Sequence, residues 1–73
     1  MNIIETGYGE DILGQSTVKY RILERLENGD FRVERFMIMT SYYGNPYYAV
    51  CPGPKRVISK LWDIHTEEIP NEG

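Results

Sequence analysis

The chain has 73 residues and a mass of 8.5 kDa, a size that corresponds to one small domain over residues 1–73. Its hydrophobic content of 41% and charged content of 26% are typical of a globular protein and exclude a collagen-like, low-complexity or wholly disordered chain. Eight basic against eleven acidic residues leave a net charge of −3. This balance disfavours a strongly basic nucleic-acid binder, although a local basic patch counts for more than the total.

No stretch of the sequence is suited to a membrane or to export. The apolar run at 36–39 is far shorter than the roughly 20 residues that cross a bilayer. Residues 1–6 lack the basic start and apolar stretch of a secretory signal. The single cysteine, Cys51, has no partner for an internal disulfide. These features predict a cytoplasmic protein.

Charge divides the chain into three parts. Residues 1–18 and 61–73 carry acidic side chains and no basic ones, whereas 19–60 hold all eight basic residues and only four acidic ones. We therefore expect an acidic, Gly-containing lead segment at 1–15, a locally basic middle, and a disordered tail at 70–73. A chain of this size without disulfides is also expected to form a homo-oligomer.

The first clear structural signal is Asn28-Gly29 between two runs rich in β-formers, which predicts a β-hairpin. A register with Tyr20 opposite Met37 and Ile22 opposite Arg35 gathers the apolar residues on one face and the charged ones on the other. In this register Glu24 and Arg35 are diagonal neighbours able to pair. A wider four-residue loop is an equal alternative to a tight turn, because a tight turn places two acidic side chains opposite each other.

The next segment predicts a third strand. Residues 36–39 are apolar at consecutive positions, so we expect that stretch to be central and covered on both faces. Gly44-Asn45-Pro46 then predicts a second turn, followed by a strand over 47–51. Pro52-Gly53-Pro54 ends that strand, with Pro54 suited to the first position of a helix.

A helix is expected over 55–66, where five residues recur at helical spacing: Val57, Ile58, Leu61, Trp62 and His65. The fold class predicted is therefore α+β, a small antiparallel sheet of three to four strands with one short C-terminal helix. The alternative is a final strand through Trp62, Ile64 and Thr66 that closes an SH3-like small β-barrel. The β-branched residues of this segment favour the alternative.

The search for catalytic and cofactor chemistry is mostly negative. One cysteine and one histidine do not supply the ligands of a structural zinc site, so no metal and no cofactor are expected. The spacing of Gly7, Gly9 and Gly14 fits neither a dinucleotide-binding motif nor a phosphate loop, and indicates a flexible turn. Cys51 with His65 is a poor nucleophile and base, because a strand cysteine behaves as a small hydrophobe. We do not expect an enzyme.

The most distinctive feature is a tyrosine-rich turn. Four tyrosines surround its Asn45 tip, and with Trp62 they form the expected binding residues: Tyr42, Tyr43, Tyr47 and Tyr48. Tyrosine provides large amphipathic contact area at low entropic cost, which suits recognition. The competing interpretation is β-propensity, in which alternate tyrosines pack on the core.

Three function classes fit these residues. The first is a non-enzymatic protein-binding module, an inhibitor or adaptor such as a phage-type anti-defence protein, acting through the tyrosine-rich turn and the acidic ends. The second is single-stranded nucleic-acid binding by aromatic stacking. It would use a basic hairpin face made of Arg21, Arg25, Arg32, Lys55, Arg56 and Lys60. The third is sequestration of a nucleotide-like small ligand by an oligomer.

Overall fold

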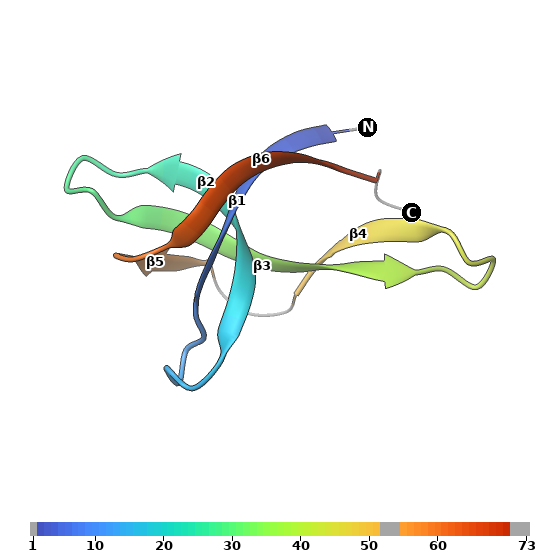
Figure 1. The fold of residues 1–73 in the computed structure, drawn as a ribbon, viewed down its shortest axis with the longest axis horizontal. Coiled ribbons are helices and arrows are strands. Elements are labelled where there is room, and N and C mark those ends of the chain that lie inside the picture. The colour runs from blue at the N-terminus through green and yellow to red at the C-terminus, as the bar shows by residue number, and fades with distance from the viewer. Residues whose placement is uncertain (1, 52–54, 71–73) are drawn as a thin grey trace.

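The computed structural model describes residues 2–51 and 55–70, which form six antiparallel β-strands (Figure 1). The strands are β1 Asn2–Glu10, β2 Thr17–Arg25, β3 Phe31–Thr40, β4 Pro46–Val50, β5 Arg56–Ile58 and β6 Trp62–Ile69. They hydrogen-bond in the order β4-β3-β2-β1-β6, and β5 pairs with β3. The described part of the chain holds no helix, and hence no helix long and apolar enough to cross a membrane.

The α+β prediction is wrong, because 55–66 forms β5 and the first part of β6 in place of a helix. Residues 62–69 are extended because they pair with the edge of β1 that β2 leaves open, from Asn2↔Ile69 to Tyr8↔Trp62. The alternative with a final strand through Trp62, Ile64 and Thr66 therefore describes this segment better. Among the described residues, however, β6 does not hydrogen-bond to β4 or β5, so strand pairing does not close a barrel. Pro52, Gly53 and Pro54 lie outside the described residues, as do 71–73 of the predicted tail.

The β2–β3 hairpin forms, but its register differs from the predicted one by two residues. Tyr20 faces Arg35 and Ile22 faces Val33. The loop is wider than a two-residue turn: the Leu26 amide donates to the Asp30 carbonyl at 2.8 Å, and Gly29 adopts a φ of 91°. A β-bulge between Ile22 and Glu24 then shifts the pairing.

From Tyr20 to Ile22 the shift is two residues, an even number, so the side chains of this stretch keep their predicted face of the sheet. Tyr20, Ile22 and Val33 are accordingly buried. Beyond the bulge, where Glu24 pairs with Arg32, the difference is one residue. The expected partner of Glu24 is wrong, however, because Glu24 Oε1 accepts from Arg32 Nε at 3.0 Å rather than pairing with Arg35.

The first of two small cores forms where β1 passes under Tyr20. A Cβ atom on Gly9 would lie 2.8 Å from Ile58 Cδ1 and 3.2 Å from Tyr20 Cε2, so only glycine fits without a shift of these neighbours. Tyr20 Oη donates to the Glu10 carbonyl at 2.7 Å and accepts from Arg56 at 2.8 Å. Gly9 thus lies within a paired strand rather than in the flexible turn that its spacing indicated.

The second core brings together Ile4, Phe36, Tyr48 and Ile69 from β1, β3, β4 and β6. The rings of Phe36 and Tyr48 lie 5.2 Å apart. Side chains alternate along a strand, and Phe36 is three positions from Val33 on β3, so the two cores lie on opposite faces of the sheet. The sheet is strongly twisted (Figure 1), and Val33 and Phe36 are buried on its two opposite faces.

A second bulge bends β6 against β1. The register shifts between Thr6 and Tyr8, so Asp63 and Ile64 oppose the single residue Gly7. Asp63 has a φ of 53°, in the left-handed region that a residue with a Cβ seldom adopts. The bulge turns the Asp63 carbonyl toward Nδ1 of His65, 2.8 Å away.

Replacing Val33 by Asp should unfold the protein, because Val33 is 0% exposed and the carboxylate would have no partner. We expect a loss of more than about 3 kcal/mol in the free energy of unfolding, measured by urea titration. The matched control is Val57→Asp on the adjacent β5, where the valine is 48% exposed and the loss should stay below about 1 kcal/mol. Equal losses in the two variants would contradict the burial pattern.

The left-handed backbone at Asp63 predicts opposite effects of two substitutions. Asp63→Gly should leave the stability unchanged or raise it, since glycine adopts this conformation freely. Asp63→Val should lower the free energy of unfolding by about 1–2 kcal/mol, because a β-branched residue is strained there. Thermal unfolding of the two variants tests the bulge, and a valine variant as stable as the glycine variant would refute it.

Candidate functional site: the β3–β4 arm

The second half of β3 and the whole of β4 form a two-stranded projection, here called the β3–β4 arm (residues 36–50). Its strands pair from Phe36↔Val50 to Thr40↔Pro46. The ladder between β2 and β3 ends at Tyr20↔Arg35, and β2 turns away at this point, so the arm projects past β2 (Figure 1). Within the arm, β3 and β4 therefore pair only with each other among the described residues.

The tip of the arm is an ordered loop over 41–45. The Ser41 amide donates to the Asn45 carbonyl at 2.8 Å, and the Gly44 amide donates to the Ser41 carbonyl at 2.9 Å. The Asn45 amide donates to Ser41 Oγ at 3.1 Å. Gly44 has a φ of 84°, which explains the choice of glycine at this position. Asn45 thus holds the loop through its backbone and leaves its side chain exposed.

The four tyrosines around this tip have different environments. Tyr42 and Tyr43 are 96% and 86% exposed, and their rings meet edge to face at 5.3 Å. Tyr47 is half-buried. Tyr48 is only 3% exposed, and its hydroxyl donates to Glu34 Oε1 at 3.2 Å. Burial raises the pKa of Tyr48 despite the hydrogen bond with Arg21. Only Tyr42 and Tyr43 are fully available for binding.

The sides of the arm are apolar and partly uncovered. Met37 and Met39 lie on one face, Ile38 and Val50 lie on the other, and all four are more than a third exposed. The expectation that 36–39 is covered on both faces is therefore wrong for the single chain. Residues 36–51 contain no charged side chain, although 26% of the whole chain is charged. This charge-free run is a signal from which the arm was predictable.

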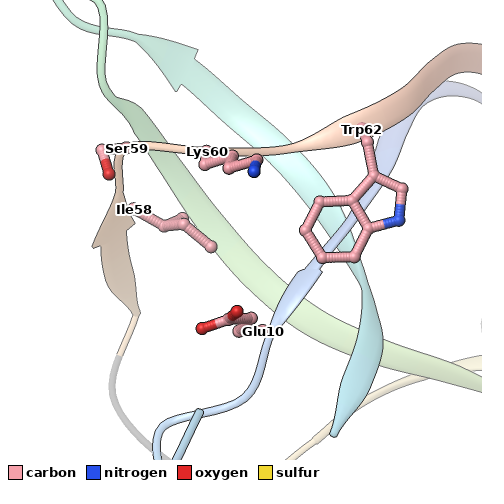
Figure 2. A pocket seen from close by; sticks show the side chains of 5 residues that line it. All are labelled: Glu10, Ile58, Ser59, Lys60 and Trp62. Carbon is pink, nitrogen blue, oxygen red and sulfur yellow. The ribbon is translucent and has the colours of Figure 1, made fainter.

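Trp62 does not join the tyrosines. It begins β6 next to β5, at the opposite end of the molecule from the tip (Figure 1). There it lines a pocket of about 270 Å³ together with Glu10, Ile58, Ser59 and Lys60. The ring and Ile58 flank the space, and Glu10 and Lys60 occupy the other two sides (Figure 2). The pocket has no tyrosine in its lining, contrary to what the small-ligand hypothesis requires.

Most residues of the predicted basic face are engaged within the chain. Arg25 pairs with Glu5 at 2.7 Å, and Arg32 pairs with Glu24 at 3.0 Å. Arg56 donates to the Tyr20 hydroxyl at 2.8 Å. The Arg21 guanidinium lies 5.9 Å from the ring centre of Tyr48. Lys55 and Lys60 are exposed. The structure thus does not assemble a continuous line of free cations along the hairpin.

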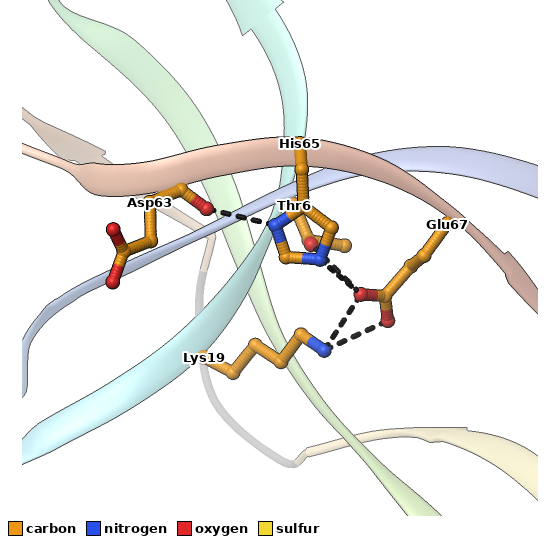
Figure 3. A network of polar contacts seen from close by, with 5 residues as sticks. All are labelled: Thr6, Lys19, Asp63, His65 and Glu67. Carbon is orange, nitrogen blue, oxygen red and sulfur yellow. Dashed lines mark hydrogen bonds and ion pairs between the residues drawn. The ribbon is translucent and has the colours of Figure 1, made fainter.

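A polar cluster joins β2 to β6 across β1 (Figure 3). Both oxygens of Glu67 accept from Lys19 Nζ at 2.8 Å, and Glu67 Oε2 also lies 2.7 Å from His65 Nε2. Burial is the largest single influence on Glu67 and raises its pKa. The hydrogen bonds from Lys19 and His65 together outweigh burial, so the pKa of Glu67 is lowered overall. The hydrogen bond to the Asp63 carbonyl, followed by that to Glu67, raises the pKa of His65 above its ordinary 6.5.

This cluster is not a catalytic triad. Asp63 orients His65 through its main-chain carbonyl, not its carboxylate, and Cys51 instead donates its amide to the Arg35 carbonyl at the base of the arm. Among residues 2–51 and 55–70, no group of three or more potential ligands is arranged to hold a metal ion. We interpret the cluster as a polar link between strands.

The raised pKa of His65 predicts a pH-dependent stability. The folded chain holds the His65 proton more tightly than the unfolded chain, so its stabilisation is complete below pH 6.5 and is lost as the pH rises through the folded pKa. We expect the melting temperature to fall from pH 6 to pH 8 in the natural chain and to fall less in His65→Gln. Equal slopes in the two proteins would contradict this assignment.

Comparison with known proteins adds no relative to this description. No protein-family model matches the sequence, and neither the curated proteins nor the solved structures that were compared with it include a match.

Proposed function

We propose that the chain is a non-enzymatic protein-binding module, an inhibitor or adaptor, that contacts its partner through the tip of the β3–β4 arm. The observation that carries the proposal is the pair Tyr42 and Tyr43, almost fully exposed at the end of an uncharged projection. Two such rings offer roughly 300 Å² of contact area. Aromatic residues at the centre of an interface often supply much of its binding energy.

The loop that carries these rings supports the proposal. Its hydrogen bonds among Ser41, Gly44 and Asn45 are already formed in the free chain. A preformed loop loses little conformational freedom on binding, which leaves more of the contact energy available as affinity.

The acidic ends offer fewer free carboxylates for partner binding than the sequence suggested. Pairing of β1 with β6 places them side by side, but Glu5 is bound to Arg25 and Glu67 to Lys19. Since these carboxylates are neutralised within the chain, the proposal relies on the tip. The nucleic-acid alternative has less support because Arg25, Arg32 and Arg56 are similarly engaged.

The proposal predicts that the double variant Tyr42→Ser/Tyr43→Ser loses its partner. The purified chain would be immobilised, exposed to lysate with and without nuclease, and the retained proteins measured by quantitative mass spectrometry. A stoichiometric protein should be retained by the natural chain regardless of nuclease, and at least about tenfold less by the tip variant.

The matched control is Ile12→Ser/Leu13→Ser, which removes two neighbouring apolar side chains of similar exposure in the loop between β1 and β2. It should retain the partner as the natural chain does. Equal retention by the tip variant would overturn the proposal, and retention that nuclease abolishes would favour the nucleic-acid alternative.

A further inference from the structure

The arm has one open backbone edge, and its hydrogen-bonding groups can be assigned. The Arg35 carbonyl accepts from Cys51 at 3.0 Å, and the Ser41 amide donates to Asn45 at 2.8 Å. Main-chain groups of an antiparallel strand point alternately to its two neighbours. The odd positions of β3 between these two residues thus face β4, and Ile38 and Thr40 direct their N–H and C=O groups to the other edge.

No strand of the described chain lies on that edge. The β2 ladder ends at Tyr20↔Arg35, and the main-chain groups of Ile38 and Thr40 have no partner among residues 2–51 and 55–70. Natural edge strands are usually protected by charges, bulges or proline. This half of β3 has none of the three, whereas the outer edge of β4 begins with Pro46, which has no N–H to donate.

The molecule is more extended than a compact monomer of its size. The accessible area is 5235 Å², compared with about 4,700 Å² for a compact monomer of this mass. The radius of gyration is 12.8 Å, compared with about 11 Å for a compact domain of this length. Phe36 and Tyr48 anchor the base of the arm in the second core. Since a two-stranded ribbon alone is at best marginally stable in water, further contacts would stabilise its outer part.

We propose that these contacts come from a second copy of this chain, whose β3 pairs antiparallel with the open edge of β3 about a two-fold axis at Met39. Ile38 of one copy then faces Thr40 of the other, and the N–H and C=O groups of both residues gain partners. An axis at Ile38 would instead place Phe36 in the pairing, next to the Tyr20↔Arg35 pair where β2 already occupies the edge.

The side chains at this edge suit a second copy. Met39, 39% exposed, meets itself across the axis, flanked by apolar and uncharged residues. An isologous contact must be complementary to itself, and a charge-free apolar edge meets this condition even though each chain carries a net charge of −3. The inference concerns the edge of the arm and does not depend on what the tip binds.

A charge-swap experiment tests the axis. Met39→Lys and Met39→Glu would be purified separately as full chains, and their masses measured by light scattering after size exclusion. The natural chain should have twice its 8.5 kDa mass. Each variant should be monomeric, because like charges face each other, and an equimolar mixture should restore the dimer, because Lys then faces Glu. Val57→Lys, at a similarly exposed valine of β5, should remain dimeric.

Cysteine trapping tests the same axis without introducing charge. Residues that face each other without mutual hydrogen bonds lie about 4.5 Å apart between Cα atoms, within the range of a disulfide. Met39→Cys in a Cys51→Ser background should oxidise to a covalent dimer, whereas Val57→Cys in the same background should not. A natural chain that is monomeric at high micromolar concentration, or a folded Met39→Cys variant that does not crosslink above the Val57→Cys control, would overturn the inference. A monomer that still binds through its tyrosines would leave the proposed function intact.

Discussion

The close approach of Tyr20 and Ile58 to Gly9 is the contact on which the sheet depends. β1 lies between β2 and β6, and a side chain at Gly9 would push Ile58 away from the strand. The absence of that side chain lets β5, the β5–β6 loop and Tyr20 meet over β1 as one core. Arg56 and the Glu10 carbonyl then satisfy the buried Tyr20 hydroxyl, so the apolar contact is closed without an unpaired polar group.

The positions of the two cores, on opposite faces of the sheet, explain why the outer part of the arm is uncovered. The first core, on the face of Tyr20 and Val33, ends where the pairing of β2 with β3 ends. The second core, which contains Phe36 and Tyr48, covers only the base of the arm on the other face. Toward the tip, Ile38 and Met39 lie on opposite faces and are both more than a third exposed, and among the described residues no strand other than β4 pairs with this part of β3. Among residues 2–51 and 55–70, β1 and β6 pair with each other and do not pair with the arm.

The distribution of charge has a related consequence. Lys19, Arg25 and Arg32 each pair with a carboxylate from the same sheet, so three cations of the basic middle are neutralised within the fold, two of them by Glu5 and Glu67 of the acidic ends. Exposed ion pairs of this kind contribute little stability but do occupy the charged groups. The surface that remains distinctive is therefore the uncharged arm with Tyr42 and Tyr43 at its tip.

Local patterns were sufficient to predict the β2–β3 hairpin, its buried face with Tyr20 and Val33, and the turn at Gly44, because alternation and turn residues act over a few positions. They were not sufficient for Gly9 or for 55–66. Glycine in a strand resembles glycine in a turn until its neighbours are known, and the spacing of Val57 and Leu61 fits a helix as well as two short strands. Pairing with strands distant in the sequence decides that 55–66 is extended: β5 pairs with β3, and β6 pairs with the free edge of β1. Which tyrosines are buried depended on the same long-range contacts, since Tyr48 is covered by Ile4 and Ile69, residues at the two ends of the chain.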